Sequence, residues 1–300
     1  MKVFVRALAL TGIFLSPCMA SNEPPAEGFC AQEGDIPVRP AGDLSGSVWA
    51  MRLGKVDDDG REALIRDALL AGEIPPFLRR LHPVELQGER DGKTTRIVLC
   101  VMPDYLSLGS DLDYLLVPMR LQTALDVADR YGFALPTPTV VDAIYAQSTV
   151  HLAPQPLPAS PAMRSTRYYL GHDALSRAQR AELGAQAGML VSGDKKDLVL
   201  TNRLWTNLER VAIYGWHRLD GHPIQPLSTV HGWHYVDYSH GVRLVSRRIL
   251  VNGKPGDFLS ALQDPSTARL LSSEGGISRI RSLIAQLAEP PLERLSAMAR

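Results

Sequence analysis

The sequence predicts an α+β protein, in which N-terminal helices and a β-hairpin precede a mostly antiparallel sheet flanked by helices. Apolar residues recur at helical spacing over residues 60–71 and 121–131. Alternating runs over 84–87 and 94–102 flank Asp91-Gly92, a strong hairpin signal. The last third carries short segments rich in Val, Tyr and Trp, which favour strands.

The first twenty residues have the organisation of a secretory signal peptide. Lys2 and Arg6 precede an apolar run over 7–15, and residues 17–20 form a small-residue cleavage site. This run is too short to span a bilayer. We therefore expect an exported protein, periplasmic or extracellular. Cys18, directly after Pro17, leaves a lipoprotein as the alternative.

The charge balance argues against two classes of partner. Removing residues 1–20 takes away two basic side chains and no acidic ones, which leaves 30 Lys and Arg against 32 Asp and Glu. Binding to nucleic acid or to an anionic membrane would require a basic excess. The sequence therefore predicts no nucleic-acid partner and no transmembrane segment, whereas an envelope polymer or a small molecule remains a candidate ligand. It does not predict the oligomeric state.

Cys30 and Cys100 remain after removal of the signal peptide. In an oxidising compartment, an even pair of cysteines predicts a disulfide. It would tie the N-terminal segment to a buried strand. Neither cysteine has a His or Cys neighbour at the spacing of a structural zinc site.

The first half of the chain predicts a regular order of elements. These are an extended segment over 21–58 with a short strand at 47–53, a helix over 60–71, the hairpin, a strand over 114–117, helices over 121–131 and 139–147, and a strand over 150–152. Gly132 ends the second helix, and Thr137 or Thr139 caps the third. The loop that carries Asp104 and Asp111 is expected to be solvated.

A Pro-rich stretch over 153–165 predicts either a linker or a long ordered loop. As a linker it separates a helix and hairpin subdomain, 59–152, from a His-rich α+β subdomain, 166–300. The second part is expected to contain a helix over 173–188, strands over 197–201, 210–216, 234–245 and 246–252, and helices over 257–263 and 277–288.

Histidines are concentrated in the second part of the chain. Five of the eight fall within 24 residues: His217, His222, His231, His234 and His240. Imidazole titrates near physiological pH and is the commonest neutral metal ligand. The first hypothesis is a metal-dependent hydrolase, with His231, His234 and Asp194 holding a zinc ion that activates water.

The second hypothesis is catalysis without a metal, by acid and base groups. On a regular strand His234, Tyr238 and His240 share one face and Asp237 points away. A bulge at Ser239 would bring the groups together. His240 is then the general base, and Arg243 binds a carboxylate or a developing oxyanion. Asp237, Tyr238 and Ser239 complete the predicted catalytic set.

Aromatic and basic side chains near these histidines are candidate substrate contacts. They are Trp216, Trp233, Tyr235 and Lys196. Such a group also fits a non-catalytic groove that binds sugars or peptides by stacking, or the packing of a sheet core. Lys195 and Lys196 are expected to lie in a solvated turn.

Two local patterns resemble cell-wall enzymes. His231-Gly232 followed by 239–243, SHGVR, resembles the signature of L,D-transpeptidases, where HG precedes SHGC and an arginine; Val242 stands in the place of their nucleophilic cysteine. The 193–197 turn and the later His-x-Val-Asp are similar to the layout of zinc D,D-peptidases, with Asp194 near the place of their early histidine ligand. The runs GDKKDLVLTNRL, VAIYGWH and DYSHGVRLV together resemble an uncharacterised family of exported bacterial proteins.

The sequence as a whole thus predicts an exported hydrolase. It would act on a cell-envelope polymer, peptidoglycan or polysaccharide, through His231, His234, Asp237, His240 and Arg243 at one cleft. The alternative is a non-catalytic extracytoplasmic binding protein with an aromatic and histidine groove.

Overall fold

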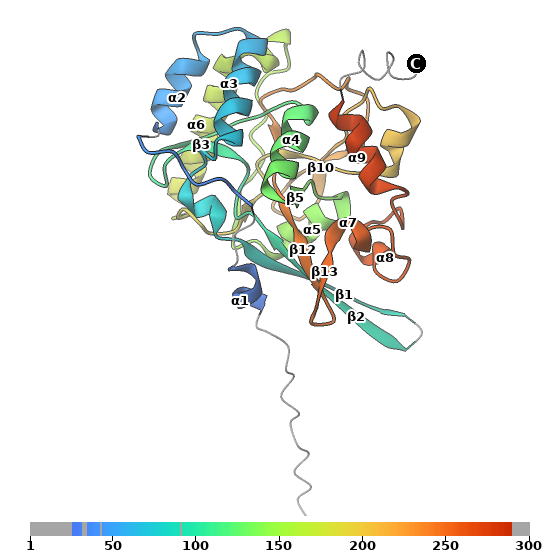
Figure 1. The fold of residues 1–300 in the computed structure, drawn as a ribbon. Coiled ribbons are helices and arrows are strands. Elements are labelled where there is room, and N and C mark those ends of the chain that lie inside the picture. Colours follow the sequence, from blue (N-terminus) through green and yellow to red (C-terminus); the bar gives the residue numbers. More distant parts are fainter. Residues whose placement is uncertain (1–25, 32–34, 43, 91, 290–300) are drawn as a thin grey trace, which may run out of the picture.

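A computed structural model describes residues 26–31, 35–42, 44–90 and 92–289 (Figure 1). The expected signal peptide and Cys18 lie outside the described residues. Within the described residues, no helix has the length and apolar character needed to cross a membrane.

The principal sheet is antiparallel and joins the two halves of the chain. Its order is β1-β2-β12-β13, with β5 also paired to β12. The strands are β1 His82–Arg90, β2 Lys93–Val101, β5 Phe133–Ala134, β12 Val245–Val251 and β13 Lys254–Asp257. The helices and this sheet confirm the α+β prediction.

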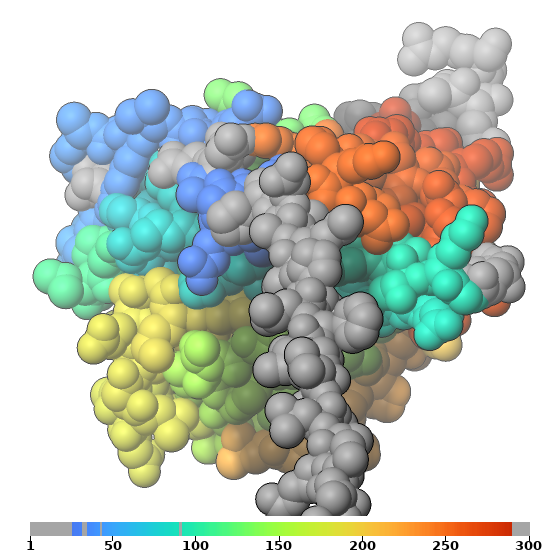
Figure 2. Space-filling view, turned by 90° about the horizontal axis from the view of Figure 1, so that it is seen from below, coloured from blue at the N-terminus to red at the C-terminus, as the bar shows by residue number. Residues whose placement is uncertain are grey.

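The predicted hairpin is present, with Val84 paired to Leu99 and Arg90 to Lys93. Gly92 has a φ of 69°, which suits a tight turn, and Asp91 lies outside the described residues. The hairpin projects from the body of the molecule in both views (Figures 1 and 2).

A second, mixed sheet carries the histidine-rich part of the chain. Its order is β10-β9-β8-β11, formed by β8 Lys196–Leu198, β9 Ile213–His217, β10 Pro223–Ser228 and β11 His240–Gly241. β8 and β11 run parallel, and His240 is the Cα partner of Lys196. Two small pairs complete the strands: β3 Ser107–Gly109 with β4 Tyr114–Leu116, and β6 Val150–His151 with β7 Val191–Ser192.

Helices pack around these sheets. The longer ones are α2 Gly46–Leu53, α3 Asp58–Leu70, α4 Leu121–Tyr131, α5 Pro138–Gln147, α6 Thr166–Glu182 and α9 Ile280–Ala288; the shorter are α1 Ala26–Cys30, α7 Phe258–Ala261 and α8 Ala268–Leu271, with 3₁₀ turns η1 Pro76–Arg79, η2 Pro161–Arg164 and η3 Asn202–Thr206. α4 contacts α3 on one side and α9 on the other (Figure 1).

Local sequence explains the ends of these helices. Gly132 ends α4 in the left-handed conformation, with a φ of 75°. Thr137 accepts a hydrogen bond from the backbone N–H of Val140, so it and not Thr139 is the cap of α5. α6 begins earlier than predicted, since Ser165 caps it, and it ends at Glu182 before Gly184.

The main hydrophobic core contains residues from Cys30 to Leu287, and two small clusters lie beside it. The Pro-rich stretch runs along the body of the protein. The N–H of Leu157 donates to the hydroxyl of Tyr238 at 2.7 Å, and Gln179 donates to the carbonyl of Ala153 at 3.1 Å. The stretch therefore lies against the histidine-rich part of the chain.

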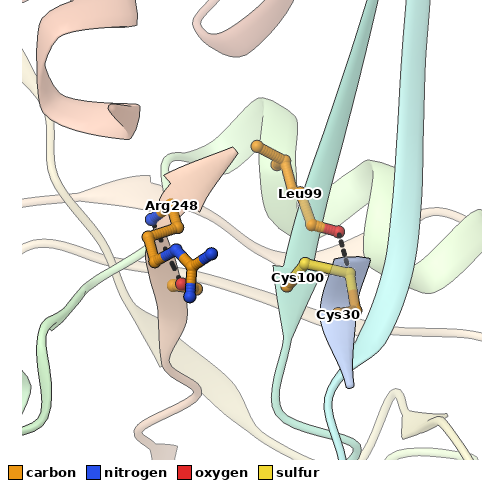
Figure 3. Close-up of a disulfide and its surroundings, with 5 residues drawn as sticks. Cys30, Leu99, Cys100 and Arg248 are labelled. Carbon is orange, nitrogen blue, oxygen red and sulfur yellow. Dashed lines mark hydrogen bonds between the residues drawn. A yellow bond between two sulfur atoms is a disulfide. The ribbon is translucent and has the colours of Figure 1, made fainter. Parts of the chain in front are cut away.

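The predicted disulfide is present between Cys30 and Cys100 (Figure 3). Its Cα atoms are 5.2 Å apart, within the usual range for a disulfide. It joins α1 to β2, and so connects the N-terminal segment to a buried strand, as predicted.

Two sequence predictions of strands are wrong. Residues 47–53 belong to the helix α2, because Ser45 caps its start and Trp49 and Leu53 bury the same helical face. The predicted strand over 234–245 contains only the two strand residues of β11 and the first residue of β12. Asp237 breaks it, since its side chain accepts the N–H of Ser239 at 2.8 Å and its carbonyl accepts the N–H of His240 at 3.1 Å, which closes a turn.

Candidate functional site

The parallel pair of β8 and β11 positions two separate polar groups of side chains. Side chains alternate along a strand, and directly paired residues point to the same side. Lys196 and His240 therefore share one side of the pair, and Asp197 lies on the other. We call the group on the first side the His240 cluster; its members are His231, Tyr235, Asp237, Ser239, His240 and Lys196.

Asp237 is the centre of the hydrogen bonds in this cluster. One carboxylate oxygen accepts the Ser239 hydroxyl at 2.6 Å, and the other accepts the Tyr235 hydroxyl at 3.0 Å. Burial alone would raise the pKa of Asp237. Two effects outweigh burial and hold this pKa below its usual value: the positive charge of His240 in the acidic range where Asp237 titrates, and the hydrogen bonds from Ser239. Asp237 is therefore an ionised carboxylate at neutral pH.

His240 is buried with only 1% of its surface exposed. Neither ring nitrogen has a hydrogen-bond partner among the described residues. Burial lowers the pKa of His240 to about 4, despite the opposing effect of Asp237. The ring is thus neutral at physiological pH. An unpaired buried polar group costs roughly 1–3 kcal/mol, and such groups are rare enough to indicate a function or a bound water.

His231 and Tyr235 form the part of the cluster that solvent reaches, since both are half-buried. Their rings are stacked, with centroids 4.0 Å apart and planes 8° from parallel. The centroid of His240 lies 5.8 Å from that of Tyr235 and 6.4 Å from that of His231. The stack therefore lies beside His240 and is a solvent-accessible part of the cluster.

Lys196 is also half-buried, with its ammonium 5.1 Å from the centroid of the Trp216 ring. Among the described residues it forms no ion pair within 4 Å. Burial lowers the pKa of Lys196, and Asp237 partly opposes this. Trp216 itself has a φ of 57°, a backbone conformation that costs a non-glycine residue about 1 kcal/mol or more.

The expectation that Lys195 lies in a solvated turn is wrong, because only 2% of it is exposed. Its ammonium donates to the carbonyl of Tyr238 at 2.7 Å and lies 3.0 Å from Nδ1 of His172. Burial lowers the pKa of Lys195 to about 8. The turn faces the interior because the neighbouring Asp194 forms a buried ion pair with Arg180.

Arg180 is shared between two buried carboxylates. Its guanidinium is 2.8 Å from Asp104 and 3.3 Å from Asp194. The prediction that Asp104 lies in a solvated loop is therefore wrong, because Asp104 is a buried ion-pair partner of Arg180. Nε2 of His172 and both carboxylate oxygens of Asp194 have no hydrogen-bond partner among the described residues, although Asp194 forms the ion pair with Arg180.

Arg243 does not belong to the His240 cluster. Its guanidinium donates to the carbonyls of Met102, at 2.9 Å, and Val191, and lies 4.5 Å from the centroid of the Tyr105 ring. The prediction that Arg243 and His240 meet at one cleft is therefore wrong. The two residues are three positions apart, but Arg243 follows the strand and turns to the opposite side.

Arg243 instead lines a cavity of about 10 Å³ together with Ser192, Asp197 and His217. This volume is roughly that of one water molecule. Burial raises the pKa of Asp197 to about 7, and the hydroxyl of Tyr105 bonds its carboxylate at 3.0 Å. No local pattern in the sequence indicates this group, because Tyr105, Asp197 and Arg243 lie far apart in the chain.

The three predicted metal ligands do not converge. His231 is stacked on Tyr235, Asp194 pairs with Arg180, and His234 is exposed beside Trp233. No group of three His, Cys, Asp or Glu within the described residues is arranged to hold a metal ion.

The predicted aromatic contacts divide into buried and accessible residues. Trp216 and Tyr238 pack in a buried ring cluster and offer no face to a ligand, which corrects the predicted role of Trp216 in stacking. Tyr238 is likewise removed from the catalytic set, since its hydroxyl is occupied by the backbone of Leu157. Trp233 and Tyr235 are half-buried and remain candidates.

No protein-family model matches the chain, and neither a curated protein nor a solved structure shows significant similarity to it. The resemblances to L,D-transpeptidases, to zinc D,D-peptidases and to exported bacterial proteins therefore stay predictions from the sequence. The His240 cluster itself is therefore the basis of the proposed function.

Proposed function

We propose that the protein is an exported hydrolase in which His240 is the general base. The observation that carries this proposal is the neutral, buried imidazole of His240, with both ring nitrogens free of partners. A general base needs an unoccupied lone pair and must be unprotonated at the working pH. His240 meets both requirements.

Asp237 completes the base. Its ionised carboxylate favours the protonated form of His240, and so stabilises the imidazolium that forms when His240 accepts a proton. Ser239 is fully buried and already donates to Asp237, so we assign it a positioning role and not that of nucleophile.

The proposed reaction uses water as the nucleophile. His240 removes a proton from a bound water, the water oxygen bonds to the electrophilic centre of the substrate, and the bond to the leaving group breaks. The imidazolium then returns the proton to the leaving group, so that His240 is regenerated. Tyr235, whose pKa burial raises to about 12, remains protonated and keeps its hydrogen bond to Asp237.

Substrate has to reach His240 past the stacked rings of His231 and Tyr235. Both belong to the loop between β10 and β11, and both are half-exposed. A side-chain rotation of these two residues would open the cluster without a change in the sheets. We therefore expect Tyr235 and His231 to contact the substrate.

The cell envelope is the proposed place of action. The disulfide between Cys30 and Cys100 supports an oxidising compartment, as does the signal-like sequence of residues 1–20. Peptidoglycan and polysaccharides are the polymers to test first, because the sequence resemblances concern cell-wall enzymes.

Hydrolysis of purified peptidoglycan and of soluble polysaccharides, followed by mass spectrometry of the released fragments, tests this function. We expect His240→Gln to lower the rate at least about 100-fold, the usual contribution of a general base. His222→Gln is the matched control, because the side chain of His222 is 79% exposed and pairs only with Asp220. A His240→Gln variant as active as the wild type would overturn the proposal.

The same assay distinguishes the proposed hydrolase from the alternative, a non-catalytic binding protein. That alternative predicts binding of the polymer with no fragments released. It also predicts that Tyr235→Ala weakens binding, since Tyr235 is a half-exposed ring, whereas His240→Gln leaves binding unchanged.

A further inference from the structure

We infer that the His240 cluster binds a substrate carrying a carboxylate, and that Lys196 is the residue that recognises it. This inference rests on the proposed function, because it takes the cluster to be the substrate site. It adds the chemical class of the substrate, which neither the sequence nor the reaction scheme specifies.

Three basic side chains surround the accessible part of the cluster. Lys196 interacts with both His240 and His231, and Arg210 interacts with His231. The guanidinium of Arg164 lies 5.8 Å from the centroid of the Tyr235 ring. All three are half-buried, so each is in reach of a ligand that contacts the stacked rings.

Two of the acidic side chains close to these cations are already engaged. Asp237 is buried and holds Ser239 and Tyr235. Asp58 lies 3.1 Å from Arg61 and 3.6 Å from Arg164. Glu209, which precedes Arg210, is exposed and offsets part of this positive charge, whereas Lys196 has no acidic partner within 4 Å among the described residues and can attract an anionic group.

Lys196 is the best placed of the three cations. Arg164 already faces Asp58, and Arg210 donates to the carbonyl of Val230 at 2.6 Å. Lys196 has no ion-pair partner within 4 Å among the described residues, and it is held against the Trp216 ring. A half-buried, positioned ammonium interacts more strongly with a carboxylate than a fully solvated one does.

The pairing of β8 with β11 also places the proposed recognition residue, Lys196, next to the proposed base, His240. Lys196 and His240 are direct partners, so a carboxylate on Lys196 would place the neighbouring part of the substrate at the base. Carboxylates of this kind occur at peptide ends and on acidic sugars. The shared chemistry is the carboxylate, and the two sources require separate measurements.

Calorimetric binding to the His240→Gln variant tests the inference without turnover. The probes are a short peptide acid with its C-terminal amide, and an oligosaccharide of glucuronic acid with its neutral glucose counterpart. We expect the charged member of at least one pair to bind at least tenfold more tightly. The pair that shows the difference identifies the source of the carboxylate.

Substitution of Lys196 supplies the second arm. Lys196→Met should abolish the preference for the acid, and Lys196→Arg should retain most of it. Lys254→Met is the matched control, because Lys254 is exposed on β13. A thermal melt of each variant confirms that it is folded.

Three results would overturn the inference. They are equal binding of the charged and neutral probes, absence of binding by both acids at millimolar concentration, and an undiminished preference for the acid in Lys196→Met. Those results would leave the proposed hydrolase intact if His240→Gln still lost activity. Conversely, a Lys196-dependent preference for acids with no hydrolysis of any polymer would support the carboxylate site and contradict only the catalytic role of His240.

Discussion

Lys196 and His240, 44 positions apart in the sequence, are direct partners in the parallel pair of β8 and β11. This pairing brings the unpaired ammonium next to the unpaired imidazole. It also places Asp197, the next residue of β8, behind the strand that carries His240. The His240 cluster and the group around Asp197 thus lie on opposite sides of the β8–β11 pair.

Replacement of His240 by Met is expected to leave the free energy of unfolding unchanged or to raise it by about 1 kcal/mol, because a buried group without hydrogen bonds is removed. Asp237→Ala should have the opposite effect, a loss of about 2 kcal/mol, since it leaves Ser239 and Tyr235 without their acceptor. Urea denaturation of both variants measures these changes. A large destabilisation by His240→Met would show that the imidazole has a structural partner.

Arg180→Met should destabilise the protein by about 3–5 kcal/mol, because it leaves the buried carboxylates of Asp104 and Asp194 without their shared cation. Arg66→Met is the control. It breaks an ion pair with Asp126 whose side chains are 46% and 32% exposed, and should cost at most about 0.5 kcal/mol. Similar losses in the two variants, measured by denaturant unfolding, would contradict the importance of the buried network.

Asp197 makes stability depend on pH. Burial raises its pKa in the folded protein to about 7, above the value of 3.8 that applies to an exposed acid. Its contribution to stability is therefore fully present below about pH 4 and is lost as the pH rises through 7. Asp197→Asn should remove this decline in stability. The free energy of unfolding of Asp197→Asn relative to the wild type should therefore rise by roughly 4 kcal/mol between about pH 4 and pH 8.

Thermal unfolding across this pH range checks the expectation. Asp220→Asn serves as the control, since Asp220 is exposed. Parallel stability curves for the wild type and Asp197→Asn would contradict a raised pKa at Asp197.

The disulfide between Cys30 and Cys100 closes a loop with a sequence separation of 70. In the chain-entropy account, a loop of this length contributes about 4 kcal/mol by restricting the unfolded chain. We expect the double variant Cys30→Ala, Cys100→Ala to lose stability of this order in denaturant unfolding. A reducing agent should destabilise the wild type similarly and leave the double variant unaffected; equal stability of the oxidised and reduced wild type would count against this contribution.

Local patterns predicted much of the fold. The apolar stripe of α4 and its stop at Gly132 reproduce the helix at its observed bounds, and the alternation around Gly92 reproduces the hairpin. These signals succeed because the residues that define each element are neighbours in the sequence. The pair Cys30 and Cys100 was predictable from the number of cysteines and the expected compartment.

The candidate site was predictable only in part. The concentration of histidines identified His231, Asp237 and His240, but an ideal strand was assumed where the side chain of Asp237 closes a turn. The burial of Lys195 could not be predicted from the neighbouring residues, since it depends on the ion pair between the adjacent Asp194 and Arg180 of α6. Arg243 was assigned to the wrong group because its hydrogen-bond partners, the carbonyls of Met102 and Val191, are distant in the sequence.

NMR titration of ring-labelled histidines tests the central claim most directly, with the signal of His240 assigned by its absence from His240→Gln. We predict that His240 stays neutral down to about pH 4, and that adding the polymer which the protein hydrolyses shifts its resonance while that of His222 is unchanged. A ring that titrates near its ordinary value of 6.5, or a resonance that no substrate affects, would contradict the role of His240 as the base.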